Sequence, residues 1–160
     1  MLGRFCKPAL CCLLAAGLVG CGFKDGVYSA EFASFDSLGY KDRLEVTVQD
    51  GTIVQADFDA VDRAGGKKSQ DEAYARRMRP LCGTDPAQLS AHYGNLLLQA
   101  ERYGAVEVDA VSGATVSSRR FAALWAALKK PLQKGETGPV VVSDVPELSP
   151  PAQSGGATGE

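Results

Sequence analysis

Two stretches of alternating apolar and polar residues, joined by a two-residue turn, place the strongest constraint on how this chain folds. Apolar side chains fall on every second position in residues 44–48 and again in residues 54–60, where Val54 and Phe58 share one face. A period of two is typical of strands with one buried face. Asp50-Gly51 between the stretches favours a tight hairpin, because that turn needs positive φ. The sequence therefore predicts an antiparallel hairpin with one apolar and one solvated face.

Two helical segments are predicted after the hairpin. Ser69-Gln70-Asp71-Glu72 has the Ser-x-x-Glu form of a capping box, which predicts the start of a helix that Pro80 ends. Asp85 and Pro86 are expected to open the second helix as its cap and its first residue, and Gly104 is expected to stop it.

Two further strands and a third helix complete the predicted domain. Apolar residues alternate with polar ones in residues 28–32 and again in residues 105–111. A last helix is expected to begin after Ser118 and to end before Pro131, and its buried face holds Phe121, Leu124, Trp125 and Leu128. The order of elements predicts an α+β fold, in which an antiparallel-dominated sheet carries its helices on one side.

The composition changes sharply after this domain, which spans residues 25–134. Glycine, proline and serine dominate residues 135–160, where Val140-Val141-Val142 is the only apolar run. Such a composition is typical of a chain that cannot bury enough apolar surface to fold. We therefore interpret residues 135–160 as a disordered tail, whose removal is expected to leave the stability of the domain unchanged.

The N-terminal residues 1–20 have the features of an export signal. Arg4 and Lys7 supply a positive start, and residues 9–19 form an apolar run. The run is too short for a permanent membrane span, which needs about 20 apolar residues.

A lipid anchor is indicated at the end of this run. Leu18-Val19-Gly20-Cys21 resembles a bacterial lipobox, in which the cysteine is acylated and becomes the first residue of the mature protein. The resemblance implies membrane lipid on Cys21, a short linker over residues 21–24, and a location on the extracytoplasmic face of a bacterial membrane. A plain secretory signal with an incidental cysteine is the alternative.

Cysteine, histidine and charge content argue against several kinds of site. Of the 5 cysteines, only Cys82 would remain unmodified in the mature chain, so no internal disulfide is expected, and we expect a small buried hydrophobe there. The single histidine, His92, is expected at the surface, and nothing indicates a metal site. The mature chain has 15 basic and 19 acidic residues, a net charge of −4, which argues against a nucleic-acid partner.

The stretch Asp109-Ala110-Val111-Ser112-Gly113-Ala114-Thr115 lies between a predicted strand and the last helix. Ser112-Gly113 breaks the strand, because glycine permits backbone angles that other residues resist. A hydroxyl beside a helix N-terminus is well placed to carry a phosphate, since unpaired N–H groups and the helix dipole favour an anion there. The junction is therefore a candidate phosphate-bearing site, although an ordinary turn with a threonine cap would have a similar sequence.

The pattern Asp-x-x-Ser-Gly-Ala-Thr resembles the flavinylation motif of the FMN-binding domain family, and the resemblance extends over about residues 25–134. It implies that an FMN transferase takes FMN from FAD and joins its phosphate to Thr115 as a phosphoester. The transferase would recognise Asp109, Ser112, Gly113 and Ala114.

An attached FMN would need partners for its phosphate and cover for its ring. Ser117 and Ser118, which we place at the N-terminus of the last helix, are expected to meet the phosphoryl oxygens, and Arg119 and Arg120 are candidates for added charge. Ring cover is expected from Tyr40, which lies in a glycine-containing loop. Core packing is the alternative for the further ring candidates, which are Tyr28, Tyr74 and Met78.

Lipid at Cys21 and flavin at Thr115 together imply a membrane-tethered electron carrier that exchanges electrons with redox partner proteins or quinones. The sequence holds no recognisable catalytic constellation, so the protein is expected to be a substrate of the transferase and not a catalyst. Two alternatives stay open. One is a lipoprotein that binds FMN or a related ligand non-covalently as a sensor or scavenger, and the other is a purely structural lipoprotein.

Overall fold

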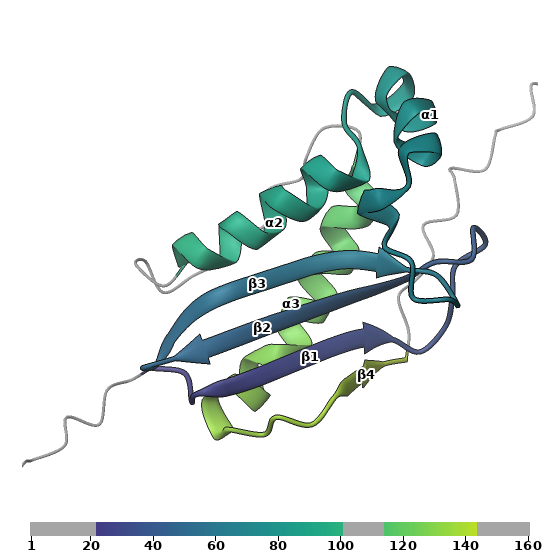
Figure 1. Cartoon of the computed structure of the whole chain (residues 1–160). Coiled ribbons are helices and arrows are strands. Elements are labelled where there is room, and N and C mark those ends of the chain that lie inside the picture. Colours follow the sequence, from purple (N-terminus) through teal and green to yellow (C-terminus); the bar gives the residue numbers. More distant parts are fainter. Residues whose placement is uncertain (1–21, 101–113, 144–160) are drawn as a thin grey trace, which may run out of the picture.

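The computed structural model describes residues 22–100 and 114–143. A four-stranded sheet in the order β3-β2-β1-β4 forms its centre, with α3 crossing behind β1 and β2 and α2 running along β3 (Figure 1). All pairs are antiparallel except β1–β4, so the predicted α+β fold is confirmed. The strands are β1 (Gly26–Phe32), β2 (Lys41–Gln49), β3 (Thr52–Val61) and β4 (Val140–Val142), and the helices are α1 (Glu72–Cys82), α2 (Pro86–Ala100) and α3 (Thr115–Lys134).

The β2–β3 hairpin forms where the alternation predicts it. Asp50 and Gly51 have φ of 52° and 76°, which is the left-handed geometry that an Asp-Gly turn favours. A register shift near the turn end of the hairpin accompanies burial of Ile53, while Val54 is 46% exposed. The prediction that Val54 shares the buried face with Phe58 is therefore wrong, because the shift exchanges the two faces at this end of β3.

The segment after α3 contributes the fourth strand of the sheet. β4 runs parallel to β1, with Val140 opposite Ala30 and Val142 opposite Phe32. Val140 and Val142 pack against the core, and Val141 between them is 59% exposed. The interpretation of residues 135–160 as a wholly disordered tail is wrong for this strand. Pairing satisfies backbone groups of β1 that would otherwise lie on an open edge, and residues 144–160 lie outside the described part of the chain.

The first helix begins and ends at residues that differ from the predicted ones. Its N-cap is Asp71, whose carboxylate accepts a hydrogen bond from the backbone N–H of Tyr74. Ser69 of the predicted capping box lies instead in the short 3₁₀ helix η1 (Lys68–Gln70). α1 includes Pro80 in its last turn and ends before Gly83. The φ of Gly83 is 70°, a left-handed conformation that glycine adopts easily because it has no Cβ.

The start of α2 agrees with the prediction, whereas the start and the end of α3 differ from it. Asp85 caps α2 by accepting from the backbone N–H of Gln88 at 2.9 Å, as expected. α3 begins at Thr115 and not after Ser118, since the carbonyl of Ala114 already accepts from the backbone N–H of Ser118. The helix also continues through Pro131 to Lys134.

α2 packs unusually close to the sheet at Gly94. A Cβ added there would lie 2.9 Å from the backbone carbonyl oxygen of Ala56 on β3. This separation is too short for a side chain, so glycine lets α2 approach the strand. The close packing holds Leu89, Tyr93 and Leu97 of α2 in the core.

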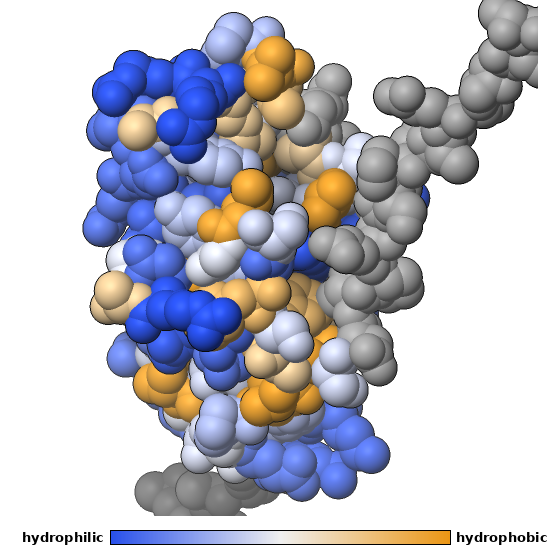
Figure 2. All heavy atoms as spheres, turned by 90° about the vertical axis from the view of Figure 1, so that its right-hand side faces the viewer, coloured by the Kyte–Doolittle hydropathy of each residue, from blue (hydrophilic) through white to orange (hydrophobic). Residues whose placement is uncertain are grey.

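Within the described residues, no helix has both the length and the apolar character needed to cross a bilayer. On the face shown in Figure 2, apolar side chains form small groups among hydrophilic ones. The exposed large apolar residues include Leu38, Leu81 and Val116, and isolated exposure of this kind is ordinary for a protein surface. The signal region, Cys21 and the predicted strand at residues 105–111 lie outside the described residues.

Candidate functional site

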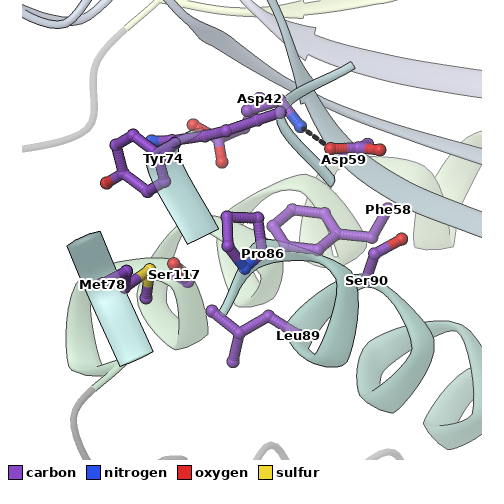
Figure 3. A pocket seen from close by; sticks show the side chains of 11 residues that line it. Asp42, Phe58, Asp59, Tyr74, Met78, Pro86, Leu89, Ser90 and Ser117 are labelled. Carbon is purple, nitrogen blue, oxygen red and sulfur yellow. Dashed lines mark hydrogen bonds between the residues drawn. The ribbon is translucent and has the colours of Figure 1, made fainter. Parts of the chain in front are cut away.

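A pocket of about 390 Å³, including its open mouth, lies where β3, α1, α2 and the first turn of α3 meet (Figure 3). Its walls combine apolar or aromatic residues with a nearly equal number of polar or charged ones. The sheet contributes Asp42, Phe58, Asp59 and Ala60. The helices contribute Tyr74, Met78, Pro86, Leu89, Ser90 and Ser117, and η1 contributes Lys68. Such a mixture is typical of small-molecule sites.

The α1 wall is fixed by Asp71. Besides capping α1, its carboxylate accepts a hydrogen bond from the Tyr40 hydroxyl at 3.0 Å. Tyr40 packs edge-on against Tyr74, with ring centroids 6.3 Å apart. The backbone N–H of Tyr74 and the Tyr40 hydroxyl lower the pKa of Asp71, because both donate to the ionised carboxylate. Tyr40 therefore supports the residue that lines the pocket.

A second polar anchor attaches η1 to the sheet. The carboxylate of Asp59, which is buried on β3, accepts hydrogen bonds from both the backbone N–H and the hydroxyl of Ser69. This anchor fixes the neighbouring Lys68, whose ammonium lies 4.3 Å from the ring centroid of Tyr74 and 4.8 Å from that of Tyr40. Sequence reasoning missed Lys68, because its position depends on a contact between residues ten apart in the chain.

The α1 and α2 walls are tied together by an ion pair. Arg79 donates to the carboxylate of Asp85 at 2.5 Å, and the Asp85 side chain is only 1% exposed. The backbone N–H of Gln88 and the Arg79 guanidinium lower the pKa of Asp85. The ionised carboxylate therefore holds the pocket residue Pro86 in place at the start of α2.

The predicted phosphate-bearing residues fall on the first turn of α3. Thr115 is exposed and is the first residue of the helix, and Ser117 lines the pocket. Ser118 is buried, and its hydroxyl is within 2.6 Å of the Tyr93 hydroxyl and donates to the carbonyl of Ala114. Ser117 is therefore the member of the predicted serine pair that faces the pocket, and Ser118 packs in the core.

Arg120, one turn further along α3, connects the helix to the sheet. Its guanidinium lies 2.6 Å from the Asp42 carboxylate and 3.4 Å from that of Asp36. Asp42 is buried, and this burial raises its pKa although the charge of Arg120 opposes the rise. The Arg120 charge is therefore engaged within the fold, whereas Arg119 is exposed.

The remaining predicted residues are either buried, at or near the surface, or outside the described part of the chain. Tyr28 lies in the core, where its hydroxyl donates to the carbonyl of Lys24. His92 is exposed, as predicted, and Cys82 is half-buried. Ala114 is buried and precedes α3. Asp109, Ser112 and Gly113 lie outside the described residues.

The pocket has the chemical character that FMN requires. Tyr74, Met78 and Phe58 offer aromatic and polarisable surface for a planar ring. The hydroxyl of Ser117 and the start of α3 suit a phosphate, because unpaired N–H groups at a helix N-terminus attract anions. Thr115 lies in the same first turn of α3 as Ser117 but is exposed and does not itself line the pocket, so a group attached to it would start within about one helical turn of the pocket wall.

Comparisons with known proteins agree with this chemistry. Residues 39–129 match the model of the FMN-binding domain, and this range contains every residue that lines the pocket. The 15 kDa lipoprotein of Treponema pallidum is 39% identical over 142 residues, which are 87% of this chain and 96% of that protein. The crystal structure of the CPE2226 protein from Clostridium perfringens has a TM-score of 0.69 and 29% identity, covering 77% of this chain and 99% of that chain. The chain belongs to the family of FMN-binding domains.

Proposed function

We propose that the protein is a lipid-anchored extracytoplasmic flavoprotein that carries FMN covalently on Thr115 and transfers electrons. The observation that carries the proposal is the position of Thr115. In a chain of the FMN-binding family, it is an exposed hydroxyl residue on the first turn of α3, the turn that also carries the pocket residue Ser117.

The attachment step needs FAD and a transferase. The Thr115 hydroxyl attacks the phosphorus on the FMN side of the FAD pyrophosphate. A phosphoester bond forms between Thr115 and FMN, and the pyrophosphate bond of FAD breaks. AMP, which contains the other phosphate of FAD, is the leaving group, and the hydroxyl proton passes to a base. An exposed Thr115 fits this role, because a second protein must reach it. The residues expected to guide that protein are Asp109, Ser112, Gly113 and Ala114.

The described residues have distinct parts in holding the cofactor. Tyr74, Met78 and Phe58 would cover the ring, and Ser117 would offer its hydroxyl to the phosphate. FMN bound here would accept and release electrons, while the protein supplies orientation and electrostatics. The pocket is open, which suits a carrier whose cofactor must come close to its partners.

Anchoring at Cys21 accounts for the N-terminal region of the sequence. The lipobox-like stretch and the similarity to a protein named a lipoprotein support it. Covalent attachment has an advantage outside the cell, where free FMN would be lost by diffusion. Redox partner proteins or quinones would then meet the flavin at the membrane surface. Non-covalent binding of FMN as a sensor or scavenger is the competing function, since the pocket by itself would serve both.

Attachment is tested by producing the chain together with an FMN transferase and measuring its mass and its fluorescence on a denaturing gel. Wild type is expected to gain one FMN and to keep yellow fluorescence. Thr115→Val should lose both, because valine keeps the shape of threonine without the nucleophile. Thr158→Val is the matched control, since Ser154-Gly155-Gly156-Ala157-Thr158 resembles the motif but lacks the preceding aspartate. Flavin retained on the Thr115→Val protein would refute the assignment.

Electron transfer is tested on the flavinylated protein by stopped-flow reoxidation with ferric chelates and quinone analogues. The carrier function predicts rates similar to those of free FMN under the same conditions. Reoxidation orders of magnitude slower with every acceptor would favour the sensor or scavenger.

A further inference from the structure

Lys68 differs from the other partly buried basic residues of the described chain. Four basic side chains are half-buried: Lys41, Lys67, Lys68 and Arg120. Three of them have a carboxylate partner, because Lys41 pairs with Glu31, Lys67 with Asp57, and Arg120 with Asp42. Among the described residues, Lys68 has no such ion pair, although it lines the pocket.

The ammonium of Lys68 instead lies against two aromatic rings, those of Tyr74 and Tyr40. A cation–π contact holds the ammonium in place but does not neutralise its charge. The side chain is also preorganised, since Asp59 fixes η1 through Ser69 and Asp71 fixes Tyr40. A positive charge is therefore held at the pocket wall before any ligand binds.

Neither carboxylate of the pocket wall forms an ion pair with Lys68. Asp42 is bonded to Arg120, and Asp59 is bonded to the backbone N–H and the hydroxyl of Ser69. A charge at the wall of a partly enclosed pocket acts more strongly on a bound group than it would in water, because the effective dielectric constant is lower. Within the described residues, Lys68 therefore offers an ammonium with no direct carboxylate partner to a ligand group that carries, or acquires, negative charge beside it.

We propose that Lys68 stabilises the negative charge of the reduced flavin ring and so raises the reduction potential of the bound FMN. The inference rests on the proposed function, in that it needs FMN in this pocket. Two electrons from a redox partner and one proton from water leave one negative charge on the ring of a reduced flavin. The oxidised ring is neutral, so the Lys68 ammonium favours the reduced state.

The first test measures the midpoint potential of the flavinylated wild type and of Lys68→Met by spectroscopic redox titration. Methionine keeps the length of the side chain and removes the charge. We expect reduced FMN to lose about tenfold in stability relative to oxidised FMN, which is a fall of about 30 mV for a two-electron couple. Lys68→Arg should restore the wild-type potential, since it retains the charge.

Lys67→Met is the matched control for net charge. Lys67 is the next residue in the chain and is half-buried, but it pairs with Asp57 and does not line this pocket. Its loss should leave the potential unchanged. An equal fall in Lys67→Met, or no fall in Lys68→Met, would overturn the proposal.

The second test separates the flavin ring from the phosphate as the anion that Lys68 meets. The Thr115→Val protein and its Lys68→Met derivative are titrated with oxidised FMN and with riboflavin, which lacks the phosphate, and binding is followed by flavin fluorescence. We expect Lys68→Met to change the affinities for FMN and for riboflavin by the same factor, because the two ligands share the flavin ring. A selective loss of FMN affinity would mean that Lys68 binds the phosphate, which contradicts the assignment to the ring.

The two proposals fail in different ways. If wild type acquires no covalent flavin, the proposed attachment fails, and the potential of non-covalently bound FMN still tests Lys68. If wild type is flavinylated and Lys68→Met has the wild-type potential, the inference about Lys68 fails while the attachment stands.

Discussion

Two aromatic clusters among the described residues have different surroundings. In the core cluster, Tyr93 stacks on Phe121 with ring centroids 4.5 Å apart, and both meet Phe58 edge-on at 5.3 Å. In the rim cluster, Tyr74 and Tyr40 lie edge to face beneath the Lys68 ammonium. Tyr93 is fully buried, whereas Tyr74, which lines the pocket, and Tyr40 behind it are half-buried.

The clusters differ in what holds them in place. The core cluster is fixed by apolar packing between β3, α2 and α3. The rim cluster is fixed by polar anchors: Asp71 holds Tyr40, and Asp59 holds the segment that carries Lys68. The comparison teaches that the core cluster determines stability, while the rim cluster forms a preorganised binding surface at little cost to the fold.

The largest predicted effect is in the core cluster. Phe121 is fully buried, so Phe121→Ala should lower the free energy of unfolding by about 3–5 kcal/mol. Tyr74→Ala is the matched change in the rim cluster and should cost only about 1 kcal/mol. Urea unfolding of both variants measures the difference. Equal losses in the two variants would contradict the division between a stabilising and a binding cluster.

What could be predicted from the sequence depends on whether a feature is set by neighbours in the chain or by distant residues. The hairpin, the α+β class and the apolar faces of α2 and α3 follow from periodicity, which depends on near neighbours in the chain. The predicted cap Asp85 is correct for the same reason, since its partner is three residues away. Val54 shows the limit of this reasoning, because a register shift depends on how two strands pair.

Sequence reasoning could address the candidate site only where it lies in one continuous stretch. That stretch predicted Thr115 on the turn before a helix and Ser117 at the helix N-terminus, whereas the helix begins at Thr115. The walls of the pocket depend on contacts between distant residues. The Tyr40–Asp71 bond spans 31 positions and the Arg120–Asp42 bond spans 78, so neither periodicity nor local caps could reveal them.

The next prediction extends the core region to β4, which the composition of residues 135–160 does not reveal. Val140 and Val142 pack on the core, so replacing both with serine should cost about 2 kcal/mol, since half of the transfer energy of each side chain is lost. Val141→Ser is the control, because Val141 is 59% exposed, and it should cost less than about 0.5 kcal/mol. Thermal or urea unfolding decides the question. A double variant as stable as wild type would show that β4 contributes nothing to the core.

The smallest predicted effect concerns the ion pair between α1 and α2 and its dependence on pH. Asp85 caps α2 and pairs with Arg79, and these bonds lower its pKa in the folded protein. Its pKa in the unfolded chain is about 3.9. A lowered folded pKa means that the unfolded state binds more protons, so this stabilisation is present above the unfolded pKa and is lost as the pH falls through the folded pKa.

Asp85→Asn isolates this contribution, because asparagine caps a helix about as well as aspartate but carries no charge. The variant should be less stable than wild type by about 1 kcal/mol at pH 7, a modest value because Arg79 is half exposed. The gap should begin to close as the pH falls below about 3.9, where the carboxylate of the unfolded chain gains its proton, and should be gone once the pH is below the lowered pKa of the folded protein. Urea unfolding of both proteins from pH 7 to pH 2 gives the two curves. Phe121→Ala, which removes no charge, should keep a constant gap from wild type over this range. A gap between Asp85→Asn and wild type that stayed constant with pH would mean that the charge of Asp85 does not hold α1 to α2.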